Sequence, residues 1–150
     1  MQLKVQKIHK DAILPVKSYA GDAGWDLFSV EDAEIAPQEI FLVKTGIVLA
    51  LPPQTEAQIR PRSGLALKHG ITVLNSPGTI DTGYHGEIGV ILVNHSKKPF
   101  RVTKNMRIAQ MVIQPVLQVD MLEVADIGIV DTKTPAENNR GVLGFGSSGV

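Results

Sequence analysis

The sequence LNSPGTIDTGYHGEIGV, residues 74–90, is the most informative part of this chain. The apolar, β-branched runs ITVL (71–74) and VILV (90–93) flank it, as expected of two strands joined by a long turn. Ser-Pro-Gly at 76–78 and Thr-Gly at 82–83 are turn residues, because glycine tolerates positive φ and proline presets its own φ. These features predict a hairpin.

Two polar side chains lie within the predicted hairpin, Asp81 and, close behind it, Tyr84. A lone carboxylate and a phenol on a glycine-rich loop can form a small polar pocket, since glycine lets a ligand approach the backbone. The alternative is a surface hairpin in which the Asp81 carboxylate caps a turn. The hairpin residues alone leave both interpretations open.

The composition limits the kind of protein. A chain of 150 residues with 15 basic and 15 acidic side chains predicts a single domain without net charge, which argues against nucleic acid as a partner. Because there is no cysteine, disulfides, thiolate catalysis, iron–sulfur clusters and Cys-ligated zinc are excluded. The four histidines have no metal-ligand spacing, so we expect no metal ion ligated by protein side chains alone.

No apolar run approaches the ~18 to 20 residues of a membrane span, and residues 1–10 lack the apolar block of a signal peptide. We therefore expect a cytoplasmic protein without a membrane partner.

Short extended segments separated by Gly/Pro turns make up most of the chain. Besides the hairpin strands, we predict strands at residues 3–8, 25–29, 39–51, 55–60, 100–102, 106–115 and 116–124, with a bulge at Gly46. The pattern predicts an all-β sandwich, jelly roll or barrel.

One short segment, LALKHG at 65–70, favours a helix. Ser63 is its candidate N-cap and Gly70 its C-terminal stop. The hydroxyl of Ser63, the backbone N–H of Gly64 and the guanidinium of Arg62 would then form an anion site. An ordinary capped helical turn is the other interpretation, and both stay open.

A second acidic residue, Asp26, lies in the predicted strand WDLFS (25–29) between large apolar side chains. The pattern alone favours a strand with one carboxylate pointing outward. In the last predicted core strand, Arg107 and Gln110 are the polar interruptions.

The C-terminal sequence changes character at residue 126 and ends in RGVLGFGSSGV at 140–150. Such a Gly-rich tail is typical of a flexible terminus. It also has the residues of an arm that folds over a nucleotide, with Phe145 to stack on a base and Arg140 and two serines to hold phosphates. We divide the single domain into a β-barrel core of residues 1–125 and a C-terminal arm of residues 126–150.

Five stretches together resemble, in order, the five motifs of the trimeric deoxyuridine triphosphatases (dUTP nucleotidohydrolases, dUTPases). They are AGWDL (23–27), PRSGL (61–65), GTID through Tyr84 to GEI (78–88), RIAQM (107–111), and RG to GFGSSG (140–149). The only notable departure is Ser148, where the family often has threonine.

The resemblance implies a jelly-roll-like β-barrel subunit with a flexible Gly-rich C-terminal arm. It implies a homotrimer whose three active sites are shared between subunits and closed by the arms. The implied reaction is hydrolysis of dUTP to dUMP and pyrophosphate by attack of water on the α-phosphorus, which removes dUTP from the DNA precursor pool and supplies dUMP for dTMP synthesis.

The resemblance also assigns roles to residues. Asp81 would activate the water, and Asp26 would contact a Mg²⁺ ion through water. The residues implied to bind uracil and deoxyribose are Asn75, Gly78, Tyr84, Gly89 and Phe145. Those implied to bind phosphates are Arg62, Ser63, Gly64, Gln110, Arg140, Gly146, Ser147 and Ser148. For Arg107, phosphate binding and a structural salt bridge both remain open.

Two other functions compete with this one. The dCTP deaminases share the fold and resemble the motifs in part, and a non-catalytic nucleotide-binding trimer would need no catalytic base. The presence of Asp81 together with Ser63 and the complete Gly-rich arm favours dUTP hydrolysis over both.

Overall fold

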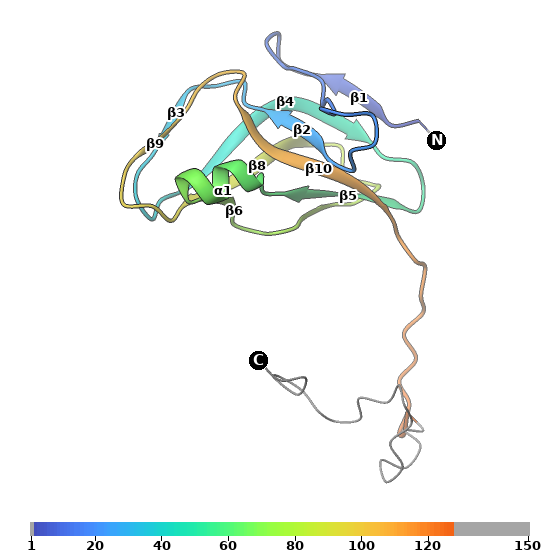
Figure 1. Cartoon of the computed structure of the whole chain (residues 1–150). Coiled ribbons are helices and arrows are strands. Elements are labelled where there is room, and N and C mark those ends of the chain that lie inside the picture. Colours follow the sequence, from blue (N-terminus) through green and yellow to red (C-terminus); the bar gives the residue numbers. More distant parts are fainter. Residues whose placement is uncertain (1, 128–150) are drawn as a thin grey trace. The chain divides into compact units, whose positions relative to one another are not determined.

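The computed structural model describes residues 2–127 and confirms the prediction of an all-β, jelly-roll-like fold. Strands and a single short helix follow one another along this part of the chain (Figure 1). They are β1 (Lys4–Lys7), β2 (Trp25–Phe28), β3 (Ala33–Ile35), β4 (Ile40–Ala50), β5 (Thr55–Arg60), α1 (Ser63–His69), β6 (Ile71–Val73), β7 (Gly78–Ile80), β8 (Glu87–Asn94), β9 (Phe100–Val102) and β10 (Arg107–Pro115). No helix within residues 2–127 is long and apolar enough to cross a membrane.

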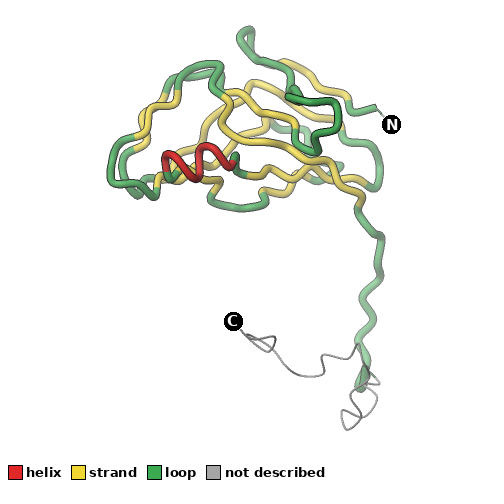
Figure 2. The backbone as a smooth tube through the Cα atoms, viewed as in Figure 1, coloured by secondary structure: helices red, strands yellow, loops and turns green. Residues whose placement is uncertain are grey.

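Two four-stranded antiparallel sheets enclose one hydrophobic core. The first has the order β1-β4-β8-β6 and the second β2-β10-β5-β7, while β3 and β9 form a separate ribbon (Figure 2). In β5 the side chains alternate strictly between buried and half-buried, as expected of a strand with one face on the core. Completely buried side chains come from both sheets, among them Leu27, Ile47, Ile88 and Met111. Each contributes about 1.5–3 kcal/mol by leaving water.

The predicted bulge at Gly46 is confirmed. The register of β4 with β8 shifts between the pairs Lys44↔Gly89 and Val48↔Glu87, and Gly46 has φ of +68°. Glycine adopts this left-handed conformation without the steric penalty that a Cβ atom brings. The bulge lies at the point where the chain returns from the hairpin stretch into the first sheet.

The predicted pairing of the two flanking strands of the hairpin is confirmed, but the residues between them contain a further strand that was not predicted. Strands β6 and β8 pair antiparallel, with Val73 opposite Leu92. Between them, however, the short strand β7 crosses to the second sheet and pairs with β5, with Gly78 opposite Ile59. Gly78 and Gly83 do not have positive φ, because Gly46 and Gly70 are the positive-φ glycines of residues 2–127. A Cβ at Gly78 would lie 3.1 Å from Nδ2 of Asn75, so the Asn75 side chain would have to move slightly.

Helix α1 forms as predicted but begins earlier than expected. Gly70 ends it in the left-handed conformation, and its N–H donates to Ala66 O. The N-cap is Arg62, not Ser63, because the Arg62 carbonyl already accepts the N–H of Ala66 at 3.0 Å. Ser63 is therefore the first helical residue, and its exposed hydroxyl makes no capping hydrogen bond.

The predicted strand at residues 116–124 is wrong. After Pro115 the chain has no further strand as far as residue 127, where the described part ends, and the N–H of Val116 donates to Gln54 O. Leu117, Met121 and Leu122 are 83%, 98% and 82% exposed. Apolar periodicity alone does not make a strand when no neighbouring backbone accepts its hydrogen bonds.

The chain divides into the units Met1–Gln118 and Val119–Val150, of which the second is described only to residue 127. The division into a core of residues 1–125 and an arm of residues 126–150 stays a prediction.

We predict that Gly46→Ala lowers the free energy of unfolding by at least ~1–2 kcal/mol, the cost of a left-handed residue with a Cβ. The added Cβ would also lie 2.7 Å from His9 Cβ and 2.9 Å from Val30 Cγ1. Urea denaturation measures the change. Gly21→Ala is the matched control, since a Cβ there would meet nothing within 4 Å. Equal stability of the two variants would contradict the strain argument.

Candidate active site

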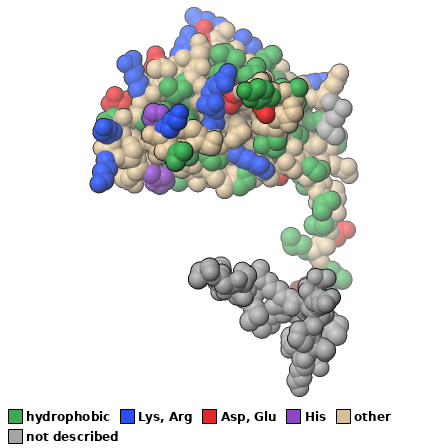
Figure 3. Space-filling model, viewed as in Figure 1, with side chains coloured by type: hydrophobic (Ala, Val, Ile, Leu, Met, Phe, Trp, Pro, Cys, Tyr) green, Lys and Arg blue, Asp and Glu red, His purple; other side chains and the backbone are tan. Residues whose placement is uncertain are grey.

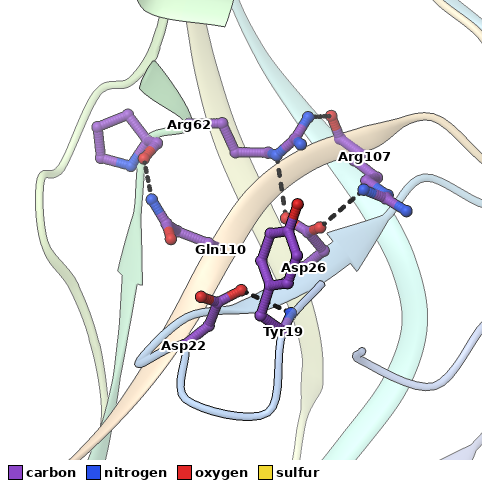
Figure 4. A network of polar contacts seen from close by, with 7 residues as sticks. Tyr19, Asp22, Asp26, Arg62, Arg107 and Gln110 are labelled. Carbon is purple, nitrogen blue, oxygen red and sulfur yellow. Dashed lines mark hydrogen bonds and ion pairs between the residues drawn. The ribbon is translucent and has the colours of Figure 1, made fainter. Parts of the chain in front are cut away.

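Asp26 lies between two guanidinium groups (Figure 4). Its Oδ1 accepts a hydrogen bond from Arg62 Nε at 3.0 Å, and its Oδ2 pairs with Arg107 Nη1 at 3.3 Å. The residue is 8% exposed, so the outward-pointing carboxylate that the strand pattern favours is wrong. A carboxylate can be buried at this position because both of its oxygens have cationic partners.

The register of the second sheet brings these residues together. In the β2–β10 pair Gln110 lies opposite Asp26, and in the β10–β5 pair it lies opposite Arg60. Arg62 lies two residues after the end of β5, and Arg107 begins β10. These residues are up to 84 positions apart in the sequence, from Asp26 to Gln110, and they meet at one end of three neighbouring strands.

An open pocket of about 380 Å³ lies beside this ion pair, and we call it the Asp26 pocket. Its lining residues are Ser18, Asp22, Ala23, Gly24, Asp26, Arg62, Ser63, Gly64 and Gln110. Four predicted phosphate-binding residues, Arg62, Ser63, Gly64 and Gln110, are thus gathered around the predicted metal-site residue Asp26. The sequence reasoning missed Ser18 and Asp22, although the loop that precedes β2 signals a turn through its glycines.

The Asp26 pocket is pre-shaped by contacts of Gln110 and Gly24. The Gln110 amide donates from Nε2 to Pro61 O at 2.9 Å, which fixes the side chain over the start of α1. Gly24 packs so closely on the Gln110 side chain that a Cβ would collide with its amide oxygen. A Cβ at Gly24 would therefore force the end of the Gln110 side chain to shift.

Arginine side chains supply hydrogen-bond donors at the Asp26 pocket. Two guanidinium groups face one carboxylate, and Arg62 Nη1 also donates to the Arg107 carbonyl at 3.3 Å. Arg107 further lies over the Phe28 ring, 5.9 Å from its centroid. Asp22 also lines the pocket, so two carboxylates balance the two guanidinium groups. Phosphate binding there would depend on donor geometry, since planar guanidinium groups suit phosphate oxygens. The structural salt bridge considered for Arg107 is present.

The predicted uracil- and sugar-binding residues lie on the hairpin stretch, together with the predicted base. This hairpin group consists of Asn75, Gly78, Asp81, Tyr84 and Gly89. Asp81 is exposed immediately after β7, and its carbonyl accepts the Tyr84 N–H at 3.0 Å. Thr82 anchors the turn by donating from Oγ1 to Thr55 O at 2.6 Å. Asp81, Thr82 and Gly83 line a second open pocket of about 460 Å³.

Tyr84 has a defined position in the hairpin. Its phenol donates to the Glu87 carbonyl at 3.1 Å, and the ring covers Gly86 so closely that a Cβ there would collide with it. The ring is 45% exposed and so presents a face to the solvent. Gly89 lies under the Leu42 side chain, which would be 2.7 Å from a Cβ at that position.

The structure does not bring the two groups into one pocket. The Asp26 pocket and the pocket beside Asp81 have no lining residue in common. The predicted residues Arg140, Phe145, Gly146, Ser147 and Ser148 lie outside the described residues. Within residues 2–127, no three His, Cys, Asp or Glu side chains cluster as a metal site.

The comparison with known protein families spans both groups. The dUTPase family model matches residues 10–149, which include both the Asp26 pocket and the hairpin group. The chain belongs to the dUTPase family. A match of this length also includes the residues of the C-terminal arm that lie outside the described part.

Curated dUTPases are similar to the whole chain. The deoxyuridine 5′-triphosphate nucleotidohydrolase of Gloeothece citriformis is 57% identical over 100% of this chain and 98% of its own. That of Clostridium acetobutylicum is 56% identical over the same shares.

Solved dUTPases share the fold. The dUTPase of Staphylococcus bacteriophage 80alpha, solved with dUpNHpp, superposes with a TM-score of 0.87 at 29% identity and covers 99% of both chains. A variant of the dUTPase from phage phi11 of S. aureus, which coordinates a structural Mg(II) ion, has a TM-score of 0.80 at 23% identity over 85% of this chain and 99% of its own. At that identity the second likeness shows the fold alone.

We predict that Asp26→Asn lowers the free energy of unfolding by about 1–3 kcal/mol, because an amide places N–H donors against guanidinium donors. We expect a smaller loss of unfolding free energy than for breaking a fully buried ion pair, since the Arg62 and Arg107 side chains are 30% and 45% exposed. Urea denaturation at neutral pH measures the loss.

The matched control for Asp26→Asn is Asp11→Asn, which removes an exposed ion pair of 2.6 Å with Lys104. The Lys104 ammonium lowers the pKa of the Asp11 carboxyl, so any stabilisation from this pair is present at neutral pH and is lost as the pH falls. We expect a clearly smaller loss than for Asp26→Asn. Equal losses would show that Asp26 contributes no more than a surface charge.

Proposed function

We propose that the chain hydrolyses dUTP to dUMP and pyrophosphate at a site built from the Asp26 pocket, the hairpin group and the C-terminal arm. The observation that carries this proposal is the family match over residues 10–149, which includes all three parts. The solved dUTPase bound to dUpNHpp supports dUTP as the substrate.

Asp81 is the proposed general base. Its carboxylate is exposed on a short turn whose ends are fixed by the β5–β7 pairing and by the Tyr84 N–H bond to the Asp81 carbonyl. It accepts a proton from water as the water oxygen attacks the α-phosphorus, and pyrophosphate leaves. A positioned base of this kind contributes ~10² to 10⁴ in rate.

The hairpin group is the proposed nucleoside site. The backbone around Gly78 and Gly89 pairs with the acceptor–donor–acceptor edge of uracil, and Asn75 adds a side-chain hydrogen bond. Cytosine presents a different hydrogen-bonding edge and leaves buried polar groups of the protein unpaired. Such a mismatch can lower kcat/KM by as much as ~10⁴-fold. The Tyr84 ring packs on the deoxyribose and leaves no room for a 2′-hydroxyl, while Phe145 of the arm stacks on the base.

The Asp26 pocket is the proposed site for the triphosphate. Arg62, the Ser63 hydroxyl and the Gly64 N–H provide charge and donors at the start of α1, and Gln110 lies beside them. The arm adds Arg140, Gly146, Ser147 and Ser148. Preorganised donors of this kind stabilise the charge that develops on the phosphates and on the leaving pyrophosphate.

The residues present fit a Mg²⁺ ion held by substrate and water better than one held in a protein cage. Asp26 accepts one described donor on each oxygen, and a carboxylate has about four acceptor positions, so a bound water can still donate to it. Mg²⁺ keeps several waters in its shell. When bound, the ion neutralises phosphate charge and supports departure of pyrophosphate.

A homotrimer with shared sites is the proposed assembly. Two findings support it: the two residue groups line different pockets of one chain, and large apolar side chains are exposed. Leu117, Met121 and Leu122 belong to these, and Leu14, Trp25 and Ile113 line an apolar pocket of about 440 Å³. Oligomer contacts commonly bury such surfaces. Sedimentation equilibrium gives the mass, and a monomer would contradict the proposal.

The proposed function is tested with dUTP, dCTP, dTTP and UTP in parallel, each with Mg²⁺ and with EDTA. We expect pyrophosphate release from dUTP alone and a strong loss of rate when EDTA removes the metal, because uncompensated phosphate charge repels the attacking water. Ammonia release from dCTP would indicate a deaminase. No turnover of any of the four nucleotides would support a binding protein.

For the base, we predict that Asp81→Asn lowers kcat at least ~10²-fold while dUTP still binds, because the amide has the size of the carboxylate and cannot take a proton. Pyrophosphate release gives kcat, and calorimetric titration with dUpNHpp gives the affinity. Asp32→Asn is the control, since Asp32 lines neither the Asp26 pocket nor the pocket beside Asp81, and its carboxylate accepts the Lys104 N–H at 3.0 Å. We expect near-normal kcat for this variant. Near-normal turnover by Asp81→Asn would refute the assignment.

A further inference from the structure

The bulge in β4 removes regular ladder bonds at the root of the hairpin stretch. Between the pairs Lys44↔Gly89 and Val48↔Glu87, three residues of β4 face the single residue Ile88 of β8. Thr45 and Gly46 are buried, so their polar groups need partners inside the protein.

Side chains replace the missing ladder bonds. The Thr45 hydroxyl donates to Ile88 O at 2.5 Å, and the Gly46 N–H donates to Glu87 Oε1 at 2.8 Å. The carboxylate of Glu87 thus takes the place of a backbone carbonyl. A hydrogen bond to an ionised acceptor is stronger than one between neutral groups. The side chain of Glu87, the first residue of β8, therefore holds the β4 bulge firmly in place.

The same residue also holds Tyr84. The Glu87 carbonyl accepts the Tyr84 phenol at 3.1 Å, and the ring lies on Gly86, the residue between them. Glu87 therefore joins a buried bulge of the first sheet, through its side chain, to the exposed ring of the hairpin, through its backbone. Movement at the start of β8 would therefore also move the Tyr84 ring.

We propose that Glu87 is a positioning residue for substrate selection, which fixes the Tyr84 ring through the β4 bulge and thereby sets the preference for deoxyribose over ribose. The inference rests on the proposed function, because it assumes that Tyr84 packs on the sugar. Glu87 itself contacts no substrate atom in this scheme. Its effect reaches the sugar through Tyr84.

Two variants of Glu87 separate its hydrogen bond from its charge. Glu87→Gln keeps an oxygen that can accept the Gly46 N–H, whereas Glu87→Ala leaves this buried N–H unpaired. We expect the ratio of kcat/KM for dUTP to that for UTP to fall about tenfold in Glu87→Ala and to stay within about threefold of wild type in Glu87→Gln. The ratio reports selectivity, which a uniform loss of stability does not change.

Hydrogen exchange of the Gly46 amide, followed by NMR, tests the contact without activity. We expect strong protection in the wild type and in Glu87→Gln, and loss of protection in Glu87→Ala. An unprotected Gly46 amide in the wild type would refute the contact. Failure of the wild type to cleave dUTP would refute the proposed function, while the exchange would still report on Glu87.

The matched control is Glu31→Ala. Glu31 Oε1 accepts the N–H of Lys44 at 2.8 Å, so this variant removes a carboxylate bond from the same strand and keeps the Glu87 bonds to Gly46 and Tyr84. We expect the dUTP/UTP ratio to be unchanged. An equal fall in Glu31→Ala would assign the effect to general loosening of β4 and overturn the proposal.

Tyr84→Phe tests the bond from the Tyr84 phenol to the Glu87 carbonyl. It replaces Glu87→Ala as the test variant if Glu87→Ala does not fold. It keeps the ring and removes only the donor to the Glu87 carbonyl. We expect a fall in the dUTP/UTP ratio similar to that of Glu87→Ala, and no further fall when the two changes are combined, because they break one link. An unchanged ratio in Tyr84→Phe, or loss of Gly46 protection in Glu87→Ala without loss of selectivity, would refute the inference.

Discussion

The antiparallel pairing of β4 with β8 is the constraint on which the rest of the structure depends. Strand β8 lies inside the first sheet between β4 and β6, and its residues Ile88, Val90 and Leu92 are completely buried in the core. The same strand receives the chain as it returns from the hairpin stretch. Strand β8 is therefore part of the core and also one end of the exposed loop with Asp81. The packing of the buried β8 residues fixes where that loop begins and ends.

The second sheet contributes the charged half of the site. A carboxylate buried at Asp26 is favourable only with partners, and β5 and β10 place Arg62 and Arg107 against it. The pocket beside this ion pair is lined by hydroxyls, small residues, an amide and a second carboxylate, that of Asp22. Figure 3 shows one face of the molecule, on which Lys and Arg side chains stand out more than Asp and Glu, although the whole chain has zero net charge. Local geometry, not overall charge, provides for anion binding.

A single chain thus contains two incomplete sites. The hairpin group has the proposed base and the Tyr84 phenol, and the Asp26 pocket has the residues proposed to bind phosphates. In the proposed trimer these halves meet across subunit boundaries, and the C-terminal arm completes them. Such an arrangement explains why residues of one reaction are spread over motifs from residue 23 to residue 149. It also makes activity depend on assembly, since neither half holds both the base and the phosphate ligands.

The sequence by itself determined the strands with clear alternation, such as β5, the bulge at Gly46, the helix stop at Gly70 and, through its motifs, the family. These features follow from local periodicity and from the conformational range of single residues. Only the tertiary structure decided that β7 crosses to the other sheet, that residues 116–124 form no strand within the described chain, and that Asp26 is buried between two arginines. The link from Gly46 through Glu87 to Tyr84 also became visible only there. The physical reason is that a hydrogen bond or an ion pair needs a partner, and partners 20 to 80 residues away are set by strand register, which no local pattern encodes.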